Sequence, residues 1–166
     1  MPATYEPIAT NTLGTATTSV TFSSIPATYT DLKIVCVGLI AGGGGFWGFR
    51  FNGDTATNYS MTFLSGNGSA ASSSRLTSNN SGYMNFAGSF NTPITLGILE
   101  VFNYAGSTNK TALVTFSGDK NGSGQVERGV NLWRNTAAIT SATIQSDTGE
   151  NFTVGTTFTL YGIKAA

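Results

Sequence analysis

The chain has 166 residues with eight Lys or Arg, eight Asp or Glu and no His, so its formal net charge is zero. Hydrophobic residues make up 40% of it and charged residues 10%, which excludes the low-hydrophobicity, high-charge composition of disordered chains. This length predicts one domain, 1–166, that buries about 70% of the surface its extended chain would expose. No run of basic residues offers phosphate neutralisation, so we expect no nucleic-acid partner.

The N-terminal MPATYEPIATNTLG lacks a basic segment followed by an apolar core, so no signal peptide is predicted. The longest apolar run, IVCVGLIAGGGGFWGF, is interrupted by glycines and is too short for a membrane helix, so we expect no membrane partner. A single cysteine, Cys36, excludes an intrachain disulfide and a multi-cysteine metal centre. Because histidine is also missing, the usual zinc ligand sets cannot form, and we expect no cofactor.

Apolar and polar residues alternate with a period of two along much of the chain, whereas no segment has the apolar spacing of an amphipathic helix. In chain order, the segments predicted as strands are 18–22, 31–40, 46–52, 58–64, 94–104, 110–118, 126–135, 138–146 and 157–164. Turn-forming Gly, Asn and Asp separate them at the intervals typical of β-sandwiches. The sequence therefore predicts an all-β fold, an antiparallel β-sandwich with a jelly-roll-like topology.

Three of these regions carry more specific expectations. The segment 31–40 is apolar at alternate positions of both faces and is predicted to be buried on most of both. In 46–52, Trp47, Phe49 and Phe51 share one face, and the Asn52-Gly53-Asp54 that follows predicts a tight turn. The Ser, Gly and Asn-rich tract 65–82 is predicted to be a long surface loop, either solvated or ordered by a partner.

Catalysis is not expected, because a chain without histidine cannot form a Ser-His or Cys-His pair. Cys36 lies within an apolar strand and is predicted to be a packed core thiol. For Glu100, at the end of a strand, an ion pair with an Arg is expected. Carboxylates of the type that cleave glycosides are present without a spacing that selects a pair: Glu100, Asp119, Glu127, Asp147 and Glu150.

Asp54, Asp119 and Asp147 lie in turns, where carboxylates can bind calcium, but turn formation explains them without a metal. The turn interpretation is favoured because the D-x-D-x-D-G pattern is missing. The run 42–45 of four glycines lacks the Lys-Ser/Thr of a phosphate loop and is predicted to be a flexible connection. Exposed aromatic residues could stack on sugars, and the candidates are Trp47, Trp133 and Tyr161; for Trp133, core or interface packing is favoured.

A likeness to a known family lies in YEPIATNTLG, VTFSSIPATYTDLKIV, RFNGDTATNYS, LSGNGSAASSSR, LWRNTAAITSATI and GTTFTLYGIKAA, which together span nearly the whole chain. By these strings the chain resembles small virion structural proteins of tailed bacteriophages, of the capsid-decoration or tail-fibre-associated type. The resemblance implies a non-enzymatic capsid decoration or cement protein, made in the host cytoplasm and carried on the capsid surface. It further implies a homotrimer whose partner is the major capsid protein and whose contacts bridge and stabilise capsomers.

Under this resemblance, 1–14 form an extended N-terminal arm that lies across the shell or pairs with a neighbouring subunit. The predicted intersubunit residues are Tyr5, Ile8, Leu13, Phe46, Trp47 and Phe49, with the sandwich core as the alternative place for the last three. A second hypothesis is a tail-fibre or spike head module that binds host cell-surface glycans through Asn67, Arg75, Asn79 and Asn80. A third, a glycan-cleaving enzyme, has no distinct acid/base pair to support it.

Overall fold

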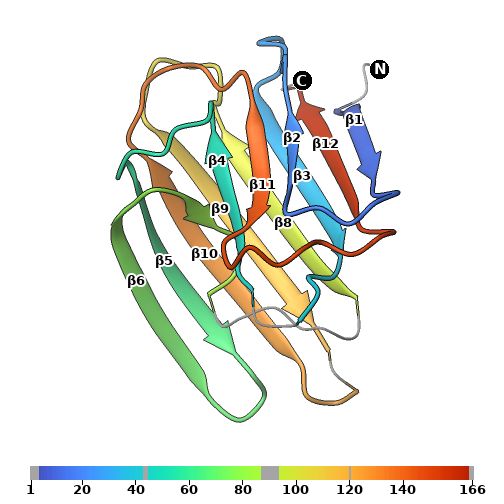
Figure 1. The fold of residues 1–166 in the computed structure, drawn as a ribbon. Coiled ribbons are helices and arrows are strands. Elements are labelled where there is room, and N and C mark those ends of the chain that lie inside the picture. The colour runs from blue at the N-terminus through green and yellow to red at the C-terminus, as the bar shows by residue number, and fades with distance from the viewer. Residues whose placement is uncertain (1–3, 43–44, 87–93, 120, 165–166) are drawn as a thin grey trace.

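The computed structural model describes residues 4–42, 45–86, 94–119 and 121–164, and every regular element in them is a strand (Figure 1). Within these ranges no helix is long and apolar enough to cross a membrane. The strands are β1 (Tyr5–Thr12), β2 (Ser19–Phe22), β3 (Asp31–Gly38), β4 (Trp47–Phe51), β5 (Tyr59–Gly66), β6 (Ala71–Asn79), β7 (Gly82–Tyr83), β8 (Thr95–Phe102), β9 (Lys110–Gly118), β10 (Gln125–Trp133), β11 (Ala142–Ser146) and β12 (Thr157–Ile163).

The strands form two antiparallel sheets of unequal size. The large sheet has eight strands in the order β1-β12-β3-β8-β9-β10-β5-β6, and the small sheet has four in the order β2-β11-β4-β7. The small sheet lies against the middle of the large one, as Figure 1 shows. These sheets confirm the predicted all-β, antiparallel, sandwich-like fold. The jelly-roll topology is not confirmed, because a jelly roll distributes eight strands over two Greek keys, whereas here one sheet alone holds eight.

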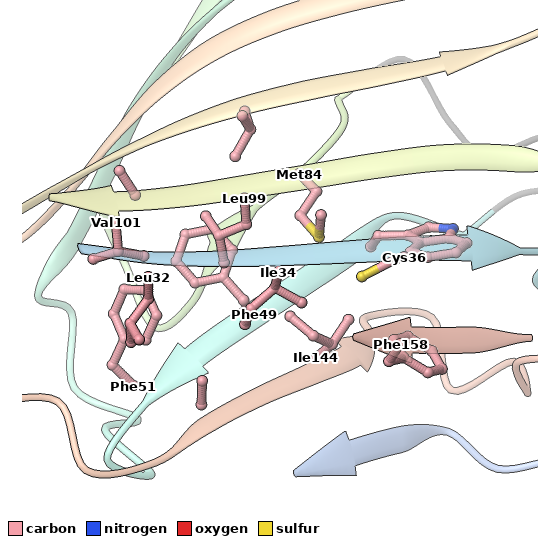
Figure 2. Close-up of a cluster of buried hydrophobic side chains, with 14 of the residues drawn as sticks. Leu32, Ile34, Cys36, Phe49, Phe51, Met84, Leu99, Val101, Ile144 and Phe158 are labelled. Atoms are coloured by element: carbon pink, nitrogen blue, oxygen red, sulfur yellow. The ribbon is translucent and has the colours of Figure 1, made fainter. Parts of the chain in front are cut away.

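The hydrophobic core lies between the two sheets and is rich in aromatic rings. Figure 2 shows the cluster around β3 and β4, where side chains from both sheets point toward each other. Trp47 is fully buried, with ring centroids 5.0 Å from Phe152 and 5.8 Å from Phe116. Cys36 is also fully buried, as predicted, and burial raises the pKa of its thiol far above the ordinary value. The predicted common face of Trp47, Phe49 and Phe51 is therefore confirmed as a core face.

Strand β3 corrects one expectation about burial. Leu32, Ile34 and Cys36 are buried against the small sheet, but Val35 is only half-buried and Val37 is 39% exposed. The prediction of burial on both faces was wrong, because none of the described elements forms a third layer over the far side of the large sheet. Apolar residues on both faces of a strand predict burial of both faces, whereas here one set faces outward.

The predicted loop 65–82 is largely a β-hairpin, and this expectation was wrong. Asn67 builds the turn: its side-chain oxygen accepts hydrogen bonds from the backbone N–H groups of Ser69 (3.0 Å) and Ala70 (2.8 Å), while Gly68 adopts a positive φ of 84°. Strand β6 then pairs with β5 from Ala71 to Asn79. Its Ser-rich sequence hid the strand, because an edge strand with little buried surface needs few apolar residues.

The N-terminal segment also differs from the predicted arm. In the described part of 1–14, strand β1 pairs with β12 of the same chain, so this segment is an edge of the large sheet. Lys164 Nζ and Glu6 Oε1 form an ion pair at 2.9 Å beside this pairing. Leu13 follows the strand, is 7% exposed and donates its backbone N–H to the carbonyl of Thr156 (2.9 Å). The N-terminal segment is thus held by contacts within one chain.

The end of the sandwich at the start of β9 is fixed by a buried lysine. Lys110 is 1% exposed, and its ammonium group donates to the backbone carbonyls of Gly106 (2.7 Å), Thr108 and Thr136 (3.3 Å). We expect Lys110→Met to lower the free energy of unfolding by about 2 kcal/mol, because it leaves these carbonyls without their charged donor. Urea titration measures the change.

The matched control for this substitution is Lys164→Met, which removes an exposed ion pair. Such pairs contribute little to stability because solvent screens them, so this variant should unfold close to the parent chain. Equal stabilities of the Lys110→Met variant and the parent chain would show that the lysine does not hold these loops.

Candidate interaction surface

The side of the large sheet that points away from the small sheet, here named the outer face, carries most of the exposed large hydrophobic side chains. Because side chains alternate along each strand and the registers align them across strands, these residues fall into continuous rows. One row runs from Val37 through Leu96 and Ser117 to Val126. The exposed apolar members of the face are Val37, Leu64, Leu96, Phe102, Val126 and Val130.

Charges on the outer face are few, and three of them, Lys33, Glu100 and Arg128, are bound to neighbours within the face. Lys33 Nζ lies 3.1 Å from Glu100 Oε1, directly across the β3–β8 register, and also lies over the ring of Tyr5. Arg128 donates to the hydroxyl of Thr115 at 2.7 Å. The remaining polar groups are mainly Thr and Ser hydroxyls, so the face presents an aliphatic and hydroxyl surface to solvent.

The six predicted intersubunit residues do not form one surface. Trp47 and Phe49 are fully buried, so the core alternative is correct for them. Phe46 is half-buried and its ring stacks on Phe86 at 5.8 Å. Ile8 is half-buried and packs against the core, and Leu13 is buried. Of the six, only Tyr5 is exposed enough to contact a neighbouring subunit: it is 51% exposed at the β1 edge of the outer face.

The four predicted glycan-binding residues are distributed along one hairpin and do not converge. Asn67 uses its side chain to form the turn before β6, whereas Asn79 ends the strand. The nine residues of β6 place these two side chains roughly 25–30 Å apart, at the usual rise of a strand. Arg75 is exposed in the middle of β6, and the carbonyl of Asn80 accepts a hydrogen bond from Arg50 Nε at 3.0 Å.

Four of the five candidate carboxylates, Glu100, Asp119, Glu127 and Asp147, are occupied by hydrogen bonds or ion pairs. Glu100 forms its ion pair with Lys33, so the expected partner type, Arg, was wrong. Asp119 Oδ1 accepts from the backbone of Gly122, three residues further on (2.6 Å), as a turn-forming carboxylate does. Asp147 Oδ1 instead accepts from the backbone of Phe46 (2.9 Å), a contact between segments far apart in the sequence. In the ranges that the structure describes, no three His, Cys, Asp or Glu side chains gather closely enough to hold a metal ion.

Two further carboxylates act inside the fold. Buried Glu127 accepts hydrogen bonds from the backbone of Phe86 (2.7 Å) and the side chain of Gln125 (2.8 Å). Asp54 accepts the indole N–H of Trp133 at 2.7 Å, and Trp133 is buried as predicted. Both residues therefore stabilise the sandwich, and sequence alternation alone did not identify either contact.

A cleft lies where the edges of the two sheets meet, between β1 and β2. Exposed Asn11 and Thr21 line its rim, and buried Phe22 and Leu160 form its floor. Threonine pairs extend this polar surface, with Thr21 and Thr143 hydroxyls 2.9 Å apart. No local sequence pattern indicates this cleft, because it depends on how the two sheets are offset.

The outer face could have been found in the sequence through its strands, which are apolar at alternate positions of both faces, as in 31–38 and 95–102. That pattern alone does not distinguish a strand covered on both sides from a strand with an exposed apolar face. Comparisons of the chain with protein-family models, with curated proteins and with solved structures found no match.

Proposed function

We propose that the chain is a non-enzymatic structural protein of a tailed-phage virion, which decorates the capsid as a homotrimer and binds the major capsid protein. The observation that carries the proposal is the outer face: a broad sheet surface with exposed Val37, Leu96 and Val130 and with its Lys33–Glu100 charges paired. Exposed apolar surface of this kind is typical of sites that bind other proteins. The resemblance of the sequence to virion structural proteins supplies the class of partner.

The outer face suits attachment to a repetitive shell. Each exposed aliphatic side chain contributes modestly when it is buried, at about 25 cal/mol per Å² of apolar surface. A trimer engages three such faces at once, so weak contacts add up through multivalency. The aromatic core behind the face keeps the sheet rigid, and little conformational entropy is lost on binding.

The test of this proposal is cosedimentation of the purified chain with empty capsids of the phage that encodes it. We expect Leu96→Glu to weaken capsid binding at least about tenfold, because it buries a charge within the outer face. The matched control is Val154→Glu, which places the same charge at an exposed position in the loop before β12. Equal binding by the Leu96→Glu variant and the parent chain would contradict a role for the outer face.

A second candidate function, binding of host cell-surface glycans by a tail-fibre or spike head, draws on the cleft between β1 and β2. Its hydroxyl and amide rim over an apolar floor matches the mixed chemistry of small-molecule sites. This function predicts that the chain binds host cells or extracted glycan, and that Thr21→Val reduces the binding. Binding to cells without binding to capsids would replace the first proposal by this one.

A further inference from the structure

The two outer edges of the large sheet, β1 and β6, differ in how they are protected against pairing with another chain. Strand β1 contains Pro7, which has no backbone N–H, and its pairing with β12 shifts register between Pro7 and Ala9. The ion pair between Glu6 and Lys164 adds charge at the same edge. Prolines, bulges and charges are the features by which proteins block edge strands. Strand β1 is therefore protected against pairing with another chain.

Strand β6, which ends the other side of the large sheet in Figure 1, lacks this protection over most of its length. From Ala71 to Leu76 it pairs regularly with β5 and contains no proline, no glycine and a single charge, Arg75. The register shift and the positive φ of Ser78 come only after this stretch. Among the described strands, none pairs with the free side of β6.

The direction of the free main-chain groups follows from the hairpin. Asn67 donates its backbone N–H to the carbonyl of Ala70 (3.2 Å), which closes the turn. Because paired residues of an antiparallel ladder alternate between bonded and non-bonded positions, the main-chain groups of Ala71, Ser73 and Arg75 point away from β5. An extended polypeptide is the ligand whose own N–H and C=O groups match this row.

The charges near β6 indicate what kind of extended segment fits. Arg75 lies on β6 itself, and Arg134, which follows β10, bonds to Ser60 on the neighbouring strand β5. The carboxylate of β10, Glu127, faces the other side and is 1% exposed. This corner is therefore positive. A second copy paired through β6 would bring two sets of arginines together, whereas acidic side chains would complement them.

We propose that β6 binds an extended acidic segment of a partner polypeptide, which adds to the large sheet as a further antiparallel strand. Acidic side chains on the outer side of the segment meet Arg75, and apolar side chains on its inner side meet Leu76, which is half-buried against the core. The inference goes beyond the proposed function, because the edge and its ligand chemistry do not depend on a capsid.

The experiment measures fluorescence anisotropy of a labelled peptide as long as β6, with alternating Glu and Val and blocked ends, titrated with the full chain. We expect saturable binding that Ser73→Pro weakens at least about tenfold, since proline removes an outward N–H and its ring obstructs the incoming strand. The matched control Ser73→Thr keeps the N–H and should bind as the parent chain does. Urea unfolding checks that both variants are folded.

A charge exchange tests the acidic specificity without a change in the backbone. A second peptide with Lys in place of Glu should bind the parent chain at least about tenfold more weakly, and Arg75→Glu should reverse this preference. Three results would overturn the proposal: no saturable binding of the Glu peptide, equal binding by the Ser73→Pro and Ser73→Thr variants, or no charge preference. A dimer of the parent chain that Ser73→Pro dissociates would assign the edge to a second copy instead.

Discussion

Replacing Trp47 with alanine is expected to lower the free energy of unfolding by about 4 kcal/mol, because the indole is fully buried among aromatic rings. Its ring centroid lies 5.0 Å from that of Phe152, 5.8 Å from that of Phe116 and 6.2 Å from that of Phe158. The surrounding rings belong to different strands and loops and cannot all close around the cavity. Urea denaturation followed by circular dichroism measures the loss.

Two companion variants make this result decisive. Trp47→Phe should cost less, because among the described residues the indole N–H has no hydrogen-bond partner to lose. Phe46→Ala, in the adjacent and half-buried position, should also cost less than Trp47→Ala. If Trp47→Ala left the stability of the chain unchanged and weakened only its assembly, the indole would belong to an intersubunit surface, as the sequence had suggested, and not to the core.

The second large effect is expected at Asp54. Its carboxylate accepts hydrogen bonds from the indole of Trp133 (2.7 Å), the side chain of Asn58 (2.8 Å) and the backbone of Ala56 (2.9 Å). Asp54→Ala should lower the free energy of unfolding at neutral pH by about 3 kcal/mol, since it leaves the buried indole N–H without an acceptor. Asp54→Asn keeps an acceptor without the charge, so its free energy of unfolding should lie between those of the parent chain and the Asp54→Ala variant.

The same residue predicts a pH dependence. Burial, the largest single effect, raises the pKa of Asp54, but the hydrogen bonds from Asn58, Trp133 and Ala56 together outweigh it and hold the pKa below its ordinary value. The stabilisation is therefore complete above the pKa of the unfolded chain, about 3.9 for Asp, and is lost as the pH falls through the folded pKa. The stability difference between parent and Asp54→Ala should shrink on acidification. The prediction would be wrong if the stability difference between the parent chain and Asp54→Ala stayed constant down to pH values below the folded pKa of Asp54.

Much of the strand pattern could be predicted, because apolar alternation bounded by turn residues is a local signal. Strand β9 has the predicted bounds 110–118, with Ala112, Val114 and Phe116 buried. The segment 138–146 was predicted too long, since β11 begins only at Ala142. Before it, the backbone of Thr140 and Ser141 is held by the side chain of Asn52, a contact between distant segments that local alternation cannot reveal.

The candidate surfaces were harder to predict than the strands. The outer face is exposed only because nothing among the described elements covers it. Alternation within a strand does not show whether a further layer packs on its second face. Strand β6 is not predicted from the sequence, because this serine-rich edge strand lacks alternating apolar residues. Conversely, the neighbouring aromatics Phe46, Trp47 and Phe49 suggest an interface, yet Trp47 and Phe49 point into the core from β4.

The central claim, decoration of a capsid, is tested most directly by counting bound chains. Purified capsids are saturated with the chain, and gel densitometry gives its molar ratio to the major capsid protein. A decoration protein should saturate at a fixed high ratio, about one chain per capsid subunit or one trimer per local threefold position of a symmetric shell. Absence of capsid binding, or only a few bound chains per particle, would contradict it.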